Sequence, residues 1–97
     1  MTRSIHRLAA QDLTEAVAFY RSEVGAGLAR RFLNNFERIA KLLEEFPGIG
    51  TPAEAGRQVF PLGDFPYSII YRAEAQGIRV LVVRHDRRDP DYGESRR

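Results

Sequence analysis

The hydrophobic pattern of residues 9–24 predicts an amphipathic helix. Apolar residues recur there at intervals of three and four, which places them on one helical face. These residues are Leu13, Ala16, Val17, Tyr20 and Val24. Asp12 and Glu15 have the spacing of a capping box, although Asp12 could equally lie in the first turn. Residues 25–27 then end the helix, because glycine readily adopts the left-handed conformation that closes helices.

A second amphipathic helix is predicted over residues 28–46. Its apolar face is formed by residues at the same intervals, which are Leu28, Phe32, Phe36, Ile39, Leu43 and Phe46. Glu37 and Lys41 are spaced for a stabilising pair on the polar face, and Pro47 ends the helix. Two such helices with a short joint predict an antiparallel hairpin. A sheet is needed to cover the hairpin, because two helices alone bury both apolar faces poorly.

The second half of the chain predicts that sheet, with strands over residues 57–62, 67–72 and 78–85. Pro61 indicates that the first strand lies at an edge or ends early. A glycine-containing loop at 73–77 joins the other two strands as a hairpin. Before the sheet, the glycine-rich residues 48–56 are predicted as loop. Near the N-terminus, residues 4–8 are predicted as a short strand whose apolar members are Ile5 and Leu8.

Alternation along the strands predicts which side chains share a face of the sheet. In the middle strand one face carries Tyr67, Ile69 and Tyr71, and the other carries Ser68, Ile70 and Arg72. In the last strand one face carries Ile78, Val80 and Val82, and the other carries Leu81 and Val83. Apolar residues on both faces indicate that this last strand lies inside the sheet.

These elements predict an α+β fold, with an N-terminal helical hairpin packed on a small antiparallel β-sheet in β-α-α-β-β-β order. The length of 97 residues predicts one domain over 1–97. Within it we expect the hairpin at about 11–46, the sheet at about 57–85 and a polar tail at 86–97 without periodicity.

Composition narrows the classes of function. Cysteine is absent, so disulfides and thiolate metal sites are excluded. The only histidines, His6 and His85, lack a metal-binding spacing, so we expect no metal and no cofactor. No apolar run is long enough to cross a membrane and no signal peptide is evident, so a cytoplasmic protein is expected. Fourteen of the fifteen basic residues are arginine, whose planar guanidinium suits phosphate or carboxylate.

The exit from the last strand gathers His85, Arg87, Arg88 and Tyr92. A histidine there suits general acid–base chemistry, the arginines suit phosphate, and the tyrosine suits base stacking. Alternatively, His85 caps the strand by bonding Asp86 or Asp89, and the arginines pair with these aspartates in solvent. The surrounding acids weaken a phosphate site because they neutralise it locally.

Three further candidates lie in the strands themselves. Arg57 either projects toward the tail or protects a sheet edge, and the edge interpretation is favoured slightly. Tyr67 and Tyr71 either form a base-stacking platform or pack in the core and against a partner, and packing is favoured.

Several segments together resemble the RelE/ParE superfamily of type II toxins. They are DLTEAVAFY, LARRFLNNFERIAKLLEEFPGIGTP, FPYSIIYR and VLVVRHDRRDPDY, and the resemblance extends over about residues 9–92. The resemblance implies a compact α+β toxin bound by an antitoxin from the same operon in a hetero-oligomer. The C-terminal segment of that antitoxin would be disordered when free and would fold on binding.

Two branches of the superfamily imply different targets. RelE-like toxins cut messenger RNA in the ribosome with basic residues and a tail tyrosine. That branch has basic residues where this chain has Ser68 and, nearby, Asp86, although Tyr92 matches the tail tyrosine. Because RNA cleavage must stabilise developing negative charge, the sequence favours the ParE branch, which inhibits DNA gyrase without catalytic residues.

Two alternatives stay open beside this prediction. One is a RelE-like ribonuclease using His85, Arg57, Arg87 or Arg88, and Tyr92. The other is a non-toxic interaction module on the same scaffold. In the ParE-like case, the residues expected to contact the target or the antitoxin are Arg57, Tyr67, Tyr71, His85, Arg87, Arg88 and Tyr92.

Overall fold

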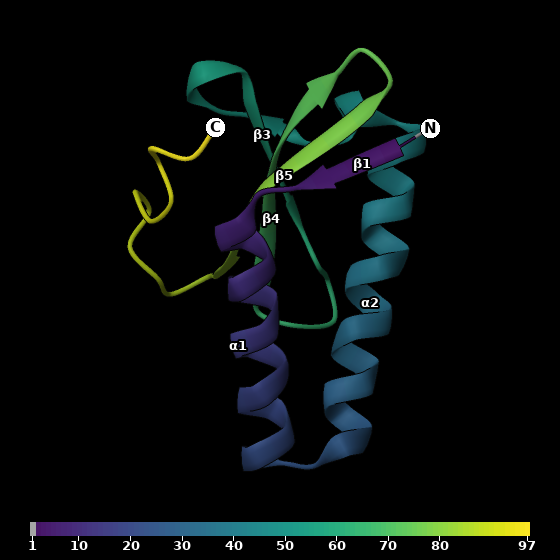
Figure 1. Cartoon of the computed structure of the whole chain (residues 1–97), viewed down its shortest axis with the longest axis vertical. Coiled ribbons are helices and arrows are strands. Elements are labelled where there is room, and N and C mark those ends of the chain that lie inside the picture. Colours follow the sequence, from purple (N-terminus) through teal and green to yellow (C-terminus); the bar gives the residue numbers. More distant parts are fainter. Residues whose placement is uncertain (1) are drawn as a thin grey trace.

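A helical hairpin packs against one five-stranded sheet in the computed structural model, which describes residues 2–97 (Figure 1). The helices are α1 (Arg7–Glu23) and α2 (Ala26–Glu45). The strands are β1 (Thr2–Ile5), β2 (Thr51–Pro52), β3 (Arg57–Pro61), β4 (Tyr67–Glu74) and β5 (Gly77–His85). This arrangement confirms the predicted α+β class. Residue 1 of the predicted domain lies outside the described part of the chain.

The strands lie in the order β1-β5-β4-β3-β2. All neighbouring pairs are antiparallel except β1 and β5, which run parallel, so the sheet is mixed. A parallel pair requires a long connection, and the hairpin of α1 and α2 and the later strands supply one between β1 and β5. Strand β5 has a neighbour on each side, which confirms its predicted interior position.

Helix α1 begins earlier than predicted. His6 is its N-cap, and the His6 Nδ1 atom accepts a hydrogen bond from the Leu8 backbone N–H at 3.0 Å. Leu8 therefore belongs to the helix, and the first strand ends at Ile5. The predicted capping box at Asp12 is wrong, because Asp12 lies inside the helix and is buried.

The apolar faces of the two helices meet the sheet largely as predicted. Four predicted residues of α2 are buried in the main core, and they are Phe32, Phe36, Ile39 and Leu43. The predicted burial of Val24 and Phe46 is wrong. Each is the C-cap residue of its helix and is exposed. Glu37 pairs with Arg3 of β1 at 3.0 Å, across elements, in place of the predicted pair with Lys41. Neither helix, within residues 2–97, has the length and apolar character needed to cross a bilayer.

The segment predicted as loop contains one more strand. β2 pairs antiparallel with β3, so β3 is not at the edge of the sheet. Pro61 instead marks the end of β3, which was the other interpretation of that proline. Two short 3-10 turns, Pro47–Ile49 and Glu54–Gly56, flank β2.

A β-bulge changes the faces of β5. Ile70 of β4 is opposite Val82, but the next residue, Tyr71, is opposite Val80, so Leu81 is the extra residue. The extra residue shifts the alternation by one. Ile78, Val80 and Val83 therefore join the helix-facing core, whereas Leu81 and Val82 join Ile70 on the opposite face. The predicted faces of Val82 and Val83 were wrong for this reason.

Tyr71 fastens the turn after α2 to the sheet. Its side chain is fully buried, and its hydroxyl accepts a hydrogen bond from the Gly50 N–H at 3.0 Å. The same hydroxyl lies 2.8 Å from the Pro47 carbonyl oxygen and 2.7 Å from Oε1 of Gln58. A Cβ atom on Gly50 would lie 2.5 Å from this hydroxyl, so the close approach requires glycine. Pro47 and Gly50 thus both bind the Tyr71 hydroxyl through their backbone groups.

Candidate functional site

The polar tail, residues 86–97, is docked on the sheet despite its lack of periodicity. It lies beside α1 and away from α2 (Figure 1). Tyr92 packs against Ile70, Leu81 and Val82 on the sheet face opposite the helices. Gly93 approaches the same place so closely that a Cβ atom there would lie 2.5 Å from Val82. The tail therefore covers the second, smaller core of the protein.

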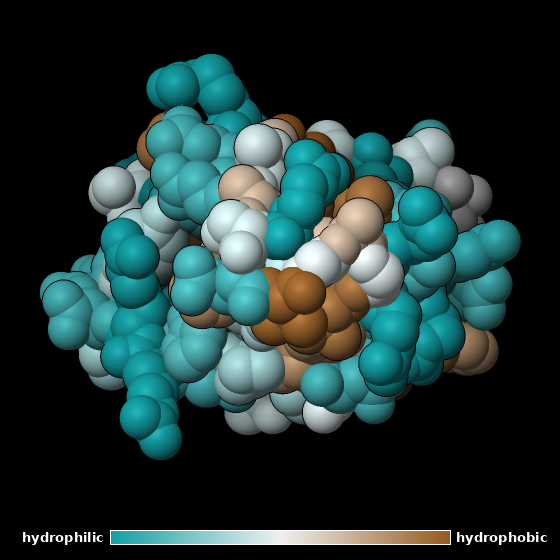
Figure 2. Space-filling model, turned by 90° about the horizontal axis from the view of Figure 1, so that it is seen from below, coloured by the Kyte–Doolittle hydropathy of each residue, from teal (hydrophilic) through white to brown (hydrophobic). Residues whose placement is uncertain are grey.

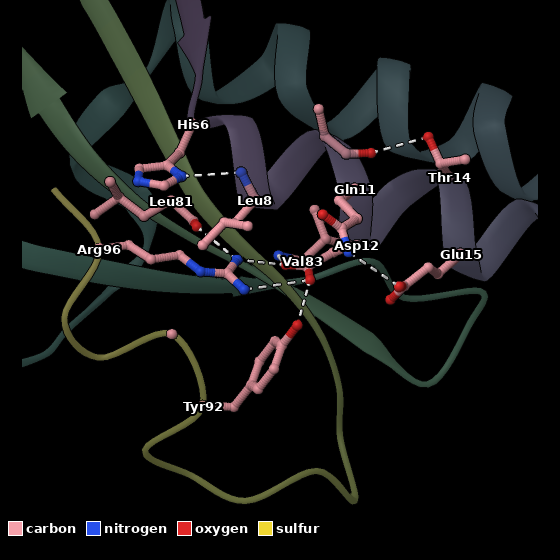
Figure 3. Close-up of polar contacts among 12 residues, drawn as sticks. His6, Leu8, Gln11, Asp12, Thr14, Glu15, Leu81, Val83, Tyr92 and Arg96 are labelled. Atoms are coloured by element: carbon pink, nitrogen blue, oxygen red, sulfur yellow. Dashed lines mark hydrogen bonds and ion pairs between the residues drawn. The ribbon is translucent and has the colours of Figure 1, made fainter.

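Asp12 of α1 is the centre of a buried polar network that holds this tail (Figure 3). Oδ2 of Asp12 accepts hydrogen bonds from Nη1 of Arg96 at 2.6 Å and from the Val83 backbone N–H at 3.1 Å. Oδ1 accepts a hydrogen bond from the Tyr92 hydroxyl at 2.5 Å. Arg96 also donates to the Leu81 carbonyl oxygen at 3.0 Å. The network thus joins α1, β5 and the tail.

Strand β1 ends before β5 does, which leaves backbone groups of β5 to be bonded by side chains. The His6 N–H donates to the Val80 carbonyl oxygen at 2.9 Å, and from Arg7 the chain turns into α1. Strand β5 continues to His85, so its backbone groups beyond Val80 have no neighbouring strand on that side. Buried backbone groups require partners, and the side chains of Asp12 and Arg96 supply them.

The network shifts the pKa values of both tail residues. Burial alone would lower the pKa of Arg96, but its bonds to Asp12 and Tyr92 outweigh burial and raise that pKa above its ordinary value. The hydrogen bond to Asp12 and, secondly, burial raise the pKa of Tyr92. The Tyr92 ring also lies between two guanidinium groups, with Arg88 4.0 Å and Arg96 4.8 Å from its centroid. Both side chains therefore keep their protons at neutral pH.

Arg57 projects from β3 toward the tail, so the favoured edge interpretation was wrong. Nη2 of Arg57 lies 3.2, 2.6 and 2.6 Å from the carbonyl oxygens of Gly93, Glu94 and Arg96. Burial lowers the pKa of Arg57. Arg57 thus acts as a second anchor for the tail, and it borders a cavity of about 360 Å³ beneath Pro90 and Tyr92.

The strand exit brings together the other predicted site residues. His85, Arg88, Tyr92 and Tyr67 line a small pocket of about 170 Å³ beside α1. The His85 Nδ1 atom accepts a hydrogen bond from the Arg87 N–H at 3.0 Å, in place of the predicted bond to an aspartate, and its ring meets the Tyr67 ring edge-on. Arg87 and Arg88 are exposed. Two exposed arginines therefore follow the end of β5, on a backbone that is held by the hydrogen bond to His85.

The tyrosines of β4 pack in the core, as favoured. Tyr71 is fully buried, so it offers no surface to a nucleobase. Tyr67 is half-buried, and its ring lies 5.0 Å from that of Phe32.

The side chains of Ser68 and Asp86 form a hydrogen bond with each other. Oγ of Ser68 donates to Oδ1 of Asp86 at 2.9 Å. These are the positions where resemblance to the RelE branch would require basic side chains. The place is therefore occupied by a hydroxyl and a carboxylate.

The sequence interpretation missed Asp12 and Arg96 as members of the site. One signal was present for Asp12, since it lies at helical spacing between Ala9 and Ala16, in the middle of a buried face. A carboxylate on such a face requires a buried partner. For Arg96 the aperiodic tail carries no corresponding signal.

Comparisons with known proteins agree with this geometry. A family model described as "ParE toxin of type II toxin-antitoxin system, parDE" matches residues 4–90. A chain from a structure described as "Chromosomal ParDE TA system from P. aeruginosa" superposes with a TM-score of 0.76 and 25% sequence identity. The match covers 88% of this chain and 95% of that one. No curated protein matches the sequence significantly. The family model spans nearly the whole chain, and the chain therefore belongs to the ParE toxin family of type II toxin–antitoxin systems, within the RelE/ParE superfamily.

Proposed function

We propose that this chain is a cytoplasmic toxin that inhibits DNA gyrase and is neutralised by a cognate antitoxin. Membership of the ParE family supports the gyrase target. The hydrogen bond between Ser68 and Asp86 is the observation that favours the ParE-like branch over the RelE-like branch.

The chemistry of RNA cleavage explains why this bond matters. Cleavage develops negative charge on phosphate, and positive groups aimed at that charge stabilise it. At the corresponding place this chain has the Asp86 carboxylate, which repels phosphate. The hydroxyl of Tyr92 donates to Asp12, so it is engaged in holding the tail. The arrangement therefore favours a toxin that acts by binding.

The exposed arginines at the strand exit are the part of the site that we propose contacts gyrase. Arg87 and Arg88 lie on a turn whose backbone is fixed by the bond from the Arg88 N–H to the His85 carbonyl oxygen at 2.9 Å. Arginines on a fixed backbone suit a partner surface that carries carboxylates. Arg57 and Tyr71, in contrast, are used for internal contacts.

Two assays with the purified chain separate the targets. We expect inhibition of gyrase supercoiling and no cleavage of messenger RNA on ribosomes. The double variant Arg87→Gln/Arg88→Gln should inhibit gyrase at least several-fold more weakly. Arg30→Gln/Arg31→Gln is the matched control, because it removes two adjacent exposed arginines from α2. Ribosome-dependent cleavage without gyrase inhibition would establish the RelE-like alternative, and inactivity in both assays would establish a non-toxic interaction module.

The outer side of the hairpin is the surface that we propose binds the antitoxin. Viewed from the hairpin tip, apolar atoms gather in the middle of the surface and are surrounded by hydrophilic residues (Figure 2). Val24 at the tip is 67% exposed. A shallow cavity of about 190 Å³ between the helices is lined by Val17, Ala29 and Leu33 and bordered by Arg21 and Arg30. An apolar antitoxin segment with flanking acidic residues fits this surface.

Thermal denaturation with the cognate antitoxin tests this surface. A partner that binds only the folded toxin stabilises it by about 2.7 kcal/mol at a concentration 100 times its Kd. Leu33→Glu should weaken this stabilisation, because it places a charge on the apolar lining. Asn34→Glu is the matched control, since Asn34 is exposed and does not line the cavity. An unchanged melting temperature with excess antitoxin would contradict the proposal.

A further inference from the structure

Three arginines form a row across the sheet, on the face opposite the helices. Arg57 of β3 is directly opposite Arg72 of β4, and Arg72 is directly opposite Arg79 of β5. Directly opposite residues of antiparallel strands point to the same face, with Cβ atoms about 5 Å apart. We call these three residues the arginine row. It lies at the end of the sheet away from Ser68 and the strand exit.

The arginine row is only partly neutralised within the protein. Arg57 contacts backbone carbonyl oxygens and lies near the charge of Glu94, and Arg79 contacts a backbone oxygen of Arg97 and the hydroxyl of Ser4. Arg72 pairs with Glu74 at 3.4 Å, and its side chain keeps 34% of its surface exposed. Exposed pairs of this kind contribute little.

The electrostatics of neighbouring groups agree with an excess of positive charge. Burial is the main cause that lowers the pKa of Arg57; the charge of Glu94 raises this pKa, and the charges of Arg72, Arg96 and Arg97 lower it further. Burial lowers the pKa of His6, and the charge of Arg79 lowers it further. Like charges directly opposite each other destabilise a sheet. A row that costs stability in the isolated protein indicates a ligand that carries several negative charges.

The surroundings of the arginine row favour phosphate over an acidic protein surface. Among residues 2–97, the exposed large apolar side chains all lie between Phe19 and Ile49, on the helices and the turn that follows them. The sheet face therefore lacks the apolar anchors that form the centre of protein interfaces. It also lacks a stacking platform for unpaired bases, because Tyr67 and Tyr71 face the helices and the Tyr92 ring lies between two arginines.

We propose that the arginine row binds the phosphate groups of double-stranded DNA without regard to base sequence. Guanidinium groups bind phosphate oxygens bidentately, and three of them on adjacent strands form a rigid series of such groups. The inference is independent of the gyrase proposal, because binding to DNA is measured without gyrase.

Salt-dependent binding to a duplex of about 20 base pairs tests the proposal by fluorescence anisotropy. Each phosphate contact contributes about −0.9 to the slope of log affinity against log salt between roughly 50 and 200 mM. Arg72→Gln should therefore reduce the slope by about 0.9 and weaken binding equally for duplexes of different sequence. Arg72 is the chosen residue because Arg57 and Arg79 also hold the tail. Arg72→Lys should keep the slope, since it keeps the charge.

Arg31→Gln is the matched control, because Arg31 is exposed on α2 and far in sequence from the row. It removes the same charge and should leave the slope unchanged. A melting curve for each variant verifies that it is folded, and Arg72→Met, which also removes the charge, tests the site if Arg72→Gln is unfolded. Equal slopes for Arg72→Gln and Arg31→Gln would overturn the proposal. Tighter binding to polyglutamate or to single-stranded RNA than to the duplex at the same salt would also overturn it.

Discussion

Asp12 and Arg96 form a buried ion pair, with 2.6 Å between Oδ2 and Nη1, although 84 positions separate them in the chain. The side chains retain 4% and 7% of their surface exposed, respectively. Each also bonds a backbone group of β5 that has no strand beside it, at Val83 and Leu81. The pair therefore replaces a missing strand and at the same time holds the tail against the sheet.

Removing the Asp12 carboxylate should strongly destabilise the fold. In the Asp12→Ala variant, Arg96 keeps a buried charge without a partner, which costs about 3–5 kcal/mol in free energy of unfolding. Urea denaturation at neutral pH measures this loss. Glu15→Gln on the same helix is exposed and should change the stability by less than about 0.5 kcal/mol. The double variant Asp12→Leu/Arg96→Met should be more stable than Asp12→Ala, because apolar residues can replace a buried pair. Equal stability of Asp12→Ala and Glu15→Gln would contradict this role.

Deprotonation of Tyr92 should lower the stability of the fold in alkaline solution. Its pKa is raised in the folded state, so above about pH 10 the unfolded chain loses this proton first. The stabilisation is therefore complete below about pH 10 and is lost as the pH rises through the folded pKa. Tyr92→Phe removes a hydrogen bond to a charged group and should cost about 1.5–3 kcal/mol at neutral pH. Urea denaturation at several pH values should show this difference shrinking above about pH 10. A constant difference would contradict the prediction.

Protonation of His6 should lower the stability of the fold in weakly acidic solution. Its Nδ1 atom accepts the N-capping bond from Leu8, so protonation breaks the cap. Burial first, and Arg79 second, lower its pKa in the folded state, so the unfolded chain binds the proton more readily. Stability is present above about pH 6.5 and is lost as the pH falls through the folded pKa. The variant His6→Asn keeps a capping acceptor without titrating in this range. Melting temperatures of both proteins between about pH 7 and 5 compare them, and parallel pH profiles would show that His6 has no such role.

Tyr71 and Gly50 should depend on each other for stability. Tyr71→Phe leaves the Gly50 N–H without its acceptor and should cost about 1–3 kcal/mol. Gly50→Ala places a methyl group against the hydroxyl, so it should also destabilise the wild-type protein. The same Gly50→Ala change should cost less in the Tyr71→Phe background, because the hydroxyl is absent there. Chemical denaturation of the four proteins gives this double-mutant cycle, and strictly additive effects would argue against the contact.

Local patterns predicted the elements well wherever one face of an element is uniformly buried. The residues of α2 from Phe32 to Leu43 reach the core as their spacing indicates. The faces of β5 were predicted correctly up to Leu81 and wrongly for Val82 and Val83, because the bulge at Leu81 arises from pairing with β4. Strand β2 was missed because two residues with a proline carry no alternation of their own. In the candidate site, His85, Arg88 and Tyr92 were predicted and do lie together.

The sequence by itself determined the hairpin, the main strands and the kinship, because these depend on repeating apolar residues and on short motifs that act between near neighbours in the chain. Only the tertiary structure decided that Asp12 binds Arg96, and that Arg57, Arg72 and Arg79 line up across three strands. Partners so far apart in sequence meet through the register of strands and the end of β1, and no local pattern of residues encodes these two features.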